Sequence, residues 1–122
     1  MSGSGKTVLL VDDDTTSLET LGEILRSEGY TVVCARNGAE ALACLHAFEP
    51  DVVMLDYVMP QMDGATTVGM LKNGPGASDV AIIMTSGLPE ELVRPRCSAY
   101  DAFLQKPIDV ERALRTLSAL AR

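Results

Sequence analysis

The sequence predicts an α/β fold in which five parallel strands form one sheet that is covered by helices on both faces. Five apolar segments alternate with five helical segments, at a spacing of roughly 20–25 residues. The first, third and fourth strand segments are apolar runs without alternation, which is typical of strands buried on both faces. Short connections between alternating strands and helices favour right-handed crossovers and parallel strands. The 122 residues suffice for one core, so we assign residues 1–6 to a flexible lead-in and residues 7–122 to a single domain.

The strand segments are bounded by charges and turn residues. The first ends at an Asp-Asp-Asp run, the second at Asn37-Gly38, and the third begins after Glu49-Pro50 and reaches Asp56 at its end. The fourth closes on Ser86-Gly87 and the fifth on Lys106-Pro107. Such residues end strands because they favour turns or require solvent. The expected strands are Thr7–Val11, Tyr30–Ala35, Asp51–Leu55, Val80–Thr85 and Ala102–Gln105.

The segments between the strands show the apolar spacing of helices that pack on a sheet. A residue within Asp14–Thr16 is expected to cap the first helix, and Gly29 is a natural end for it. Phe48, at the end of the second, is expected to face the core. Pro95 predicts a short or irregular fourth helix, because proline removes a helical hydrogen bond. The expected helices are Thr15–Glu28, Ala39–Phe48, a segment from Gly64 to about Asn73, part of Pro89–Tyr100, and a last segment that Asp109 caps.

The composition is that of a globular protein, with 47% apolar and 22% charged residues. No apolar run approaches the ~20 residues of a membrane helix, and the N-terminus lacks the apolar core of a signal peptide, so we expect a cytoplasmic protein with no membrane association. The net charge of −7 argues against direct nucleic-acid binding, which rewards clustered cations. Cys34, Cys44 and Cys97 lack the spacing of a metal site, and we interpret them as small buried side chains.

Polar side chains follow four of the five expected strands. Asp12 and Asp13 follow the first, Asp56 the third, Ser86 the fourth and Lys106 the fifth. Because parallel strands end at one edge of a sheet, and ligands bind at that edge, we expect these side chains to converge. The second strand ends without such a residue. That asymmetry suits an outer strand and favours the flavodoxin-like strand order 2-1-3-4-5.

These residue types are suited to phosphate chemistry. Converging carboxylates repel one another unless a cation neutralises them, and carboxylate oxygens with water are the ligands of Mg²⁺, which favours phosphate as a co-ligand. A carboxylate can also act as a nucleophile and form an acyl phosphate. The Lys106 ammonium and the Ser86 hydroxyl would then offset the charge of the phosphoryl group.

The ordered set resembles the receiver domain of two-component response regulators over essentially the whole chain. It comprises Asp12-Asp13, the DxxMPxMDG pattern that begins at Asp56, Ser86-Gly87 and Lys106-Pro107. The gaps of 30 residues from Asp56 to Ser86 (86 − 56) and 20 from Ser86 to Lys106 (106 − 86) also match. The resemblance implies that Asp56 accepts a phosphoryl group from a histidine kinase or a phosphotransfer protein. It further implies that Asp13, Asp56 and the backbone carbonyl of Val58 bind Mg²⁺ directly, and that Asp12 does so through water.

The resemblance also implies a conformational switch. Ser86 and Lys106 would bind the phosphoryl group, with a cis Lys106-Pro107 peptide, and Phe103 matches the family's switch aromatic. Phosphorylation would draw Ser86 toward the phosphate and turn Phe103 inward, which shifts the balance between two existing conformations. The expected consequence is control of a partner or an output domain, and self-association on phosphorylation is possible. The domain would promote only its own phosphorylation and dephosphorylation, and is not expected to be an enzyme in the usual sense.

Two other functions are open on the sequence alone. Asp12-x-Asp14-x-Thr16 after an apolar strand also fits the first motif of haloacid-dehalogenase-type phosphatases, in which Asp12 would be the nucleophile. That family needs a longer core, and it leaves the pattern around Asp56 unexplained. A receiver-like binding module that takes no phosphate is the third possibility. The complete set of acidic, hydroxyl and lysine positions favours the phosphorylated receiver.

Overall fold

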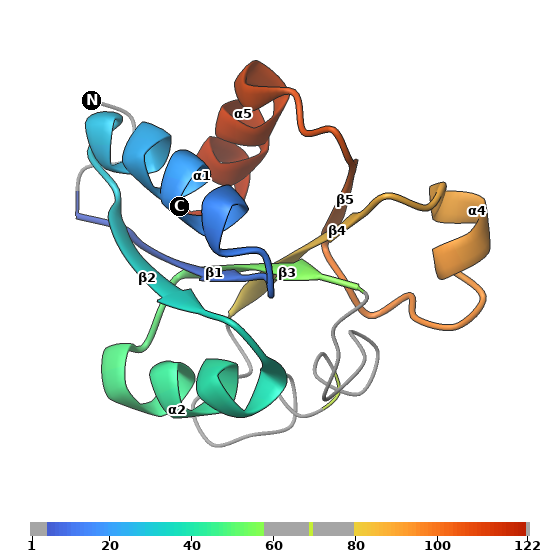
Figure 1. Ribbon diagram of the computed structural model, residues 1–122, viewed down its shortest axis with the longest axis horizontal. Helices are drawn as coiled ribbons and strands as arrows, with labels where there is room; N and C mark the ends of the chain where they lie inside the picture. The colour runs from blue at the N-terminus through green and yellow to red at the C-terminus, as the bar shows by residue number, and fades with distance from the viewer. Residues whose placement is uncertain (1–4, 58–68, 70–79, 122) are drawn as a thin grey trace.

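The computed structural model describes residues 5–57, 69 and 80–121 (Figure 1). The helix expected after Gly64 and the carbonyl of Val58 lie outside the described residues. The strands are β1 Thr7–Val11, β2 Thr31–Ala35, β3 Val52–Asp56, β4 Ala81–Ser86 and β5 Ala102–Gln105. The helices are α1 Thr15–Ser27, α2 Gly38–Phe48, α4 Glu90–Val93 and α5 Val110–Leu120.

The five strands form one parallel sheet in the order β2-β1-β3-β4-β5. This confirms the predicted doubly wound, flavodoxin-like topology. In Figure 1, α1 and α5 cover one face of the sheet and α2 lies on the other. None of the helices that the structure describes combines the length and apolar character needed to cross a membrane.

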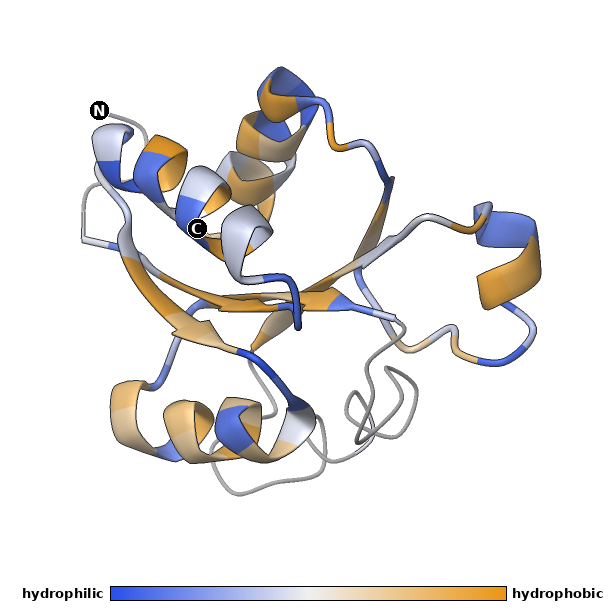
Figure 2. Ribbon diagram, viewed as in Figure 1, coloured by the Kyte–Doolittle hydropathy of each residue, from blue (hydrophilic) through white to orange (hydrophobic). Residues whose placement is uncertain are grey.

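Alternate residues of each strand contribute to opposite faces of the sheet. In β1, Val8 and Leu10 belong to the apolar cluster that includes residues of α1 and α5, whereas Leu9 and Val11 belong to the cluster that includes residues of α2. All four are at most 2% exposed. Figure 2 shows the resulting apolar character of the strands. Burial on both faces explains why the strand segments show no alternation in the sequence.

Local signals fix the ends of the first two helices. Asp14 caps α1, because its Oδ1 accepts hydrogen bonds from the backbone N–H groups of Thr16 and Ser17. Gly29 follows α1 with φ of 96°, a left-handed conformation that costs glycine little. The side chain of Asn37 caps α2 by accepting from the N–H of Glu40 at 2.8 Å. Asp14 and Gly29 therefore act as the sequence predicts.

Two side chains differ from the expectations. Phe48 is 55% exposed and does not face the core, because the chain leaves α2 at Glu49, in a left-handed conformation, and Pro50 is the buried residue at this end. Cys34 is exposed, since it lies on the outer strand β2. Cys97 is buried as expected, whereas Cys44 is only half-buried. The short α4 confirms the disruption predicted from Pro95.

Two acidic residues at the amino-terminal edge of the sheet have a structural role. Oδ2 of Asp51 accepts a hydrogen bond from the N–H of Thr7, and Oδ2 of Asp101 accepts one from the N–H of Ile82, each at 2.8 Å. Each carboxylate connects a residue that precedes one strand to the start of the neighbouring strand. These two acids are therefore separate from the acidic group at the carboxyl edge.

Candidate functional site

The carboxyl edge of the sheet brings together the acidic side chains that the sequence singles out. Asp12 follows β1 and Asp56 ends β3, and these two strands are neighbours in the sheet. Carboxylate oxygens of Asp12, Asp13 and Asp56 all lie within 4.8 Å of one another. Asp12 and Asp56 are buried whereas Asp13 is exposed, so the group opens to solvent on one side. This donor set fits Mg²⁺, because that ion binds one or two carboxylates directly and retains several waters, through which the third carboxylate can act.

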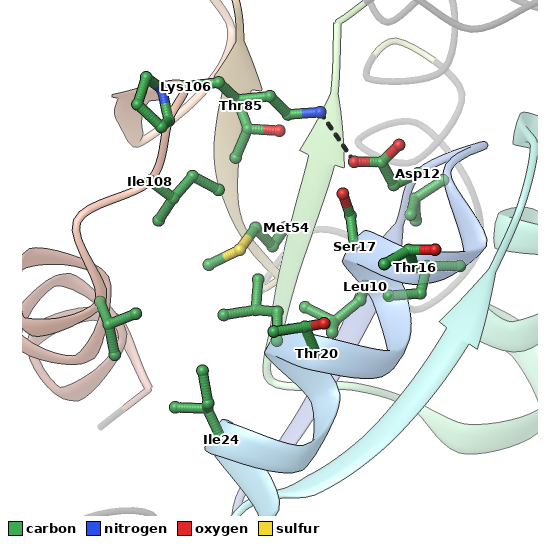
Figure 3. A pocket seen from close by; sticks show the side chains of 15 residues that line it. Leu10, Asp12, Thr16, Ser17, Thr20, Ile24, Met54, Thr85, Lys106 and Ile108 are labelled. Carbon is green, nitrogen blue, oxygen red and sulfur yellow. Dashed lines mark hydrogen bonds and ion pairs between the residues drawn. The ribbon is translucent and has the colours of Figure 1, made fainter.

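Lys106 supplies a positive charge to this acidic group. Its Nζ lies 2.8 Å from Oδ2 of Asp12 and 3.5 Å from Oδ2 of Asp56; Figure 3 shows the contact with Asp12. Burial alone would lower the pKa of Lys106, but the hydrogen bonds and charges of the two carboxylates outweigh it and raise that pKa. The ammonium is therefore charged at neutral pH. The backbone N–H of Lys106 donates to the carbonyl of Ser86 at 2.7 Å, which holds the lysine beside the end of β4. The Lys106-Pro107 peptide is cis.

The structure places Ser86 at the end of β4 and Phe103 within β5. Ser86 is 1% exposed, and its Oγ accepts a hydrogen bond from the N–H of Leu88 at 2.9 Å. The hydroxyl is thus held within the turn that follows its own strand. Phe103 is half-buried, and its ring centroid lies 5.8 Å from that of Tyr100. Ser86 and Lys106 are neighbours through their backbones, whereas Phe103 lies further from the acidic group along β5.

Asp14 belongs to helix α1 and not to the acidic group. Its Oδ1 caps the helix, and its Oδ2 accepts from the hydroxyl of Ser17 at 3.1 Å. These hydrogen bonds from Ser17 lower the pKa of Asp14. The carboxylate therefore stays ionised, and its oxygens accept hydrogen bonds from the first turn of α1. This arrangement suits a helix cap and does not suit a general acid.

A groove of about 350 Å³ lies between α1 and the connection from β5 to α5 (Figure 3). Asp12 and Lys106 lie at one end of it, so the groove is continuous with the acidic group. Its lining is mainly apolar, and α1 adds hydroxyl groups. The α1 residues that point into the groove include Thr16, Thr20 and Ile24.

The sequence did not point to this groove, although a signal was present. Thr16, Thr20 and Ile24 are spaced four residues apart, which places them on one face of a helix. Two hydroxyls on a face beside the apolar stripe indicate a surface that is only partly covered. The contact between Tyr100 and Glu90 was also missed. Nothing in the sequence indicates that the segment between them folds back to bring the two side chains together.

Comparison with known proteins identifies the family. The response regulator receiver domain matches residues 8–118. The probable transcriptional regulatory protein TcrX of Mycobacterium tuberculosis is 30% identical over 120 residues, which cover 98% of this chain and 51% of TcrX. Protein PilH of Pseudomonas aeruginosa is 32% identical over 116 residues, which cover 93% of this chain and 95% of PilH. The chain thus spans about half the length of TcrX and of other regulators that it matches, but nearly all of PilH.

Solved structures agree with this assignment. The chemotaxis response regulator CheY4 of Vibrio cholerae superposes with a TM-score of 0.87 at 28% identity, over 94% of this chain and 98% of that one. The response regulator TrrA of Thermotoga maritima, whose structure is a complex with Mg²⁺ and BeF, gives a TM-score of 0.84 at 29% identity, over 94% of this chain and 98% of that one. The chain belongs to the response regulator receiver domain family.

Proposed function

We propose that this receiver domain accepts a phosphoryl group on Asp56 in a Mg²⁺-dependent reaction and then changes conformation to control a partner or an output domain. The observation that carries the proposal is the position of Asp56. Its carboxylate belongs to the group of three acidic side chains and lies 3.5 Å from the ammonium of Lys106. A nucleophile beside a cation site and a fixed positive charge is the arrangement that phosphoryl transfer to a carboxylate requires.

The side chains would divide the chemistry as follows. An oxygen of Asp56 attacks the phosphorus atom of the donor, and the bond from phosphorus to the donor's imidazole nitrogen breaks. The electron pair of that bond remains on the imidazole. Asp12, Asp13 and Asp56 would hold Mg²⁺, which when bound neutralises charge on the phosphoryl oxygens. Lys106 would stabilise the same charge from the other side, because its ammonium already lies between Asp12 and Asp56.

Ser86 and Phe103 are the proposed switch. The Ser86 hydroxyl lies at the end of the strand next to β3, where it accepts from the N–H of Leu88. A phosphoryl group on Asp56 would recruit this hydroxyl as a hydrogen-bond donor. Phe103, half-buried on β5, would change its position in response. Phosphorylation acts in this way by favouring one of two arrangements that already exist.

The groove beside α1 supports a protein as the phosphoryl donor. Its apolar lining and its opening at Asp12 and Lys106 suit a helix that carries a phosphorylated histidine. We therefore propose a histidine kinase or a phosphotransfer protein as the donor, with its helix against Thr20 and Ile24 of α1. Self-association after phosphorylation is a further consequence that the family suggests.

The phosphatase alternative is disfavoured by the environment of Asp14. In that alternative Asp14 would protonate the leaving group, yet its carboxylate caps α1 and has a lowered pKa. A general acid needs a pKa near the operating pH. The position of Asp56 also has no role in that scheme.

Intact mass spectrometry tests the proposal. The wild type, incubated with Mg²⁺ and a small acyl-phosphate donor, should gain the mass of one phosphoryl group, and a chelator should abolish the gain. The Asp56→Asn variant should gain nothing, whereas Ser17→Ala, which alters α1 without removing a site carboxylate, should behave as the wild type. A mass gain that persists in Asp56→Asn would contradict the proposal.

A further inference from the structure

Three side chains join α4 to the segment that precedes β5. The hydroxyl of Tyr100 donates a hydrogen bond to Oε2 of Glu90 at 2.7 Å. Arg94 forms an ion pair with the same carboxylate oxygen, and its guanidinium carbon lies 5.4 Å from the centre of the Tyr100 ring. A cation at this distance from an aromatic ring is attracted to it. We call Glu90, Arg94 and Tyr100 the Tyr100 clamp.

Helix α4 depends on contacts of this kind for its position. It has four residues, and a helix so short is not stable without tertiary contacts. Pro89, at its N-cap position, has no side-chain group that could accept a hydrogen bond, and Pro95 disfavours a helical continuation. Val93, its last residue, anchors it, because this side chain is fully buried. The clamp anchors its first turn through Glu90.

The clamp contacts Phe103 directly and is connected to Ser86 through the segment between β4 and α4. Glu90 lies four residues after Ser86, whose Oγ holds the N–H of Leu88, so the connection from β4 to α4 is held at both of its ends. The Tyr100 ring also packs against Phe103, with 5.8 Å between centroids and 48° between ring planes. A movement of Ser86 or of Phe103 would therefore disturb the contacts of Tyr100.

We propose that the Tyr100 clamp stabilises the unphosphorylated arrangement of the receiver, so that phosphorylation of Asp56 acts against the hydrogen bond from Tyr100 to Glu90. This inference rests on the proposed function and adds a regulatory element to it. An interaction present in only one of two states shifts their equilibrium by its own free energy. Loss of the Tyr100 hydroxyl should therefore favour the phosphorylated arrangement by about three- to tenfold, the range expected for one such hydrogen bond.

The affinity for a phosphoryl mimic measures this shift. Tyr100→Phe removes the hydroxyl but keeps the ring beside Arg94 and Phe103. Titration with beryllium fluoride at saturating Mg²⁺, followed by NMR, should give a dissociation constant about three- to tenfold lower than that of the wild type. Tyr30→Phe is the matched control, because it removes a tyrosine hydroxyl from another part of the fold and should leave the constant unchanged.

A second measurement needs no ligand. The amide of Leu88 should exchange with deuterium faster in Tyr100→Phe than in the wild type, because the connection that carries it is then held at one end only. Glu90→Gln, which weakens both the hydrogen bond and the ion pair, should shift both measurements in the same direction. It replaces Tyr100→Phe as the test variant if Tyr100→Phe folds poorly.

The outcomes separate the clamp from the proposed function. An unchanged or weaker affinity for beryllium fluoride in both variants, with an unchanged exchange rate at Leu88, overturns the proposed role of the clamp. If the wild type still binds beryllium fluoride, that result leaves the proposed function of Asp56 supported. If the wild type fails to bind beryllium fluoride, the proposed function is contradicted and the regulatory inference falls with it. Faster exchange at Leu88 together with tighter binding supports the clamp.

Discussion

Lys106 determines the charge balance of the site. Two buried carboxylates, Asp12 and Asp56, face each other at the edge of the sheet, and a buried anion without a counter-charge is costly. The lysine contacts both of them, and its raised pKa reflects this neutralisation. The same ammonium that stabilises the carboxylates before phosphorylation is therefore in place to stabilise a phosphoryl group afterwards.

The hydrogen bond from Tyr100 to Glu90 predicts a pH window of stability. Burial and this hydrogen bond raise the pKa of Tyr100 to about 12, with Cys97 adding to the shift and Arg94 opposing it. The same bond, with Arg94 and Arg112, lowers the pKa of Glu90. A raised pKa stabilises the fold below the ordinary value near 10, and the contribution disappears as the pH rises toward 12. A lowered carboxyl pKa stabilises the fold above the ordinary value near 4.5, and this contribution disappears as the pH falls below it.

Urea unfolding of the wild type and Tyr100→Phe at several pH values checks this window. The stability difference between the two proteins should be largest between about pH 5 and pH 9 and should shrink on both sides. A difference that is constant from pH 4 to pH 11 would show that the hydrogen bond does not depend on an ionised Glu90 and a protonated Tyr100.

The hydroxyl group of Tyr30 is buried in an unfavourable environment. It is 4% exposed, and no residue in the described part of the chain offers its hydroxyl a hydrogen bond. A buried polar group without a partner loses its hydration and gains nothing in return. Tyr30→Phe should therefore raise the free energy of unfolding by about 1 kcal/mol. Equilibrium denaturation in urea measures this change, and a loss of stability of similar size would reveal a partner for the hydroxyl.

At the scale of elements, α4 illustrates how one side chain can anchor a helix. Val93 is fully buried in the apolar cluster that includes residues of α2, whereas its neighbour Leu92 is 59% exposed. Val93→Ala should lower the free energy of unfolding by about 2 kcal/mol, since it removes two buried carbon atoms and leaves a cavity. Leu92→Ala, which removes more carbon from an exposed position, should change it by less than about 0.5 kcal/mol. Equal losses in the two variants would contradict this view of α4.

The strands and helices that the structure describes were largely predictable, for a physical reason. Burial on both faces makes the inner strands β1, β3 and β4 almost entirely apolar, and a charged side chain such as Asp56 marks where the strand ends. Helix ends were predictable where a cap residue was present, as at Asp14 and Gly29. The exposure of Phe48 was not predictable, because periodicity shows which face of a helix is apolar but not how far the sheet beneath that face extends.

At the scale of the whole molecule, the strand order brings distant residues together. Because β1 and β3 are neighbours, Asp12 and Asp56 meet although 44 residues separate them (56 − 12). The sequence predicted this convergence because parallel strands end at one edge. It could not predict that Lys106 lies closer to Asp12 than to Asp56, or that Ser86 binds the N–H of Leu88, because such contacts depend on side-chain and loop geometry.

Mg²⁺ should stabilise the folded domain as a whole. A ligand that binds only the folded state raises the free energy of unfolding, by about 2.7 kcal/mol at a hundred times its dissociation constant. Asp13→Asn should weaken this effect by removing the exposed carboxylate of the acidic group, and Glu19→Gln, an exposed acid on α1, should not. Chemical denaturation with and without Mg²⁺ measures the difference. Equal stabilisation of both variants would place the ion elsewhere.

The phosphoryl group is proposed to reside on Asp56, and its position can be determined chemically. An acyl phosphate on an aspartate is reduced by borohydride, which converts that residue to homoserine and leaves the free carboxylates unchanged. Peptide sequencing by mass spectrometry, after treatment with Mg²⁺, a small acyl-phosphate donor and borohydride, then locates the modified residue. Homoserine is expected at position 56, whereas homoserine at position 12 or an unmodified position 56 would show that Asp56 is not the phosphoryl acceptor.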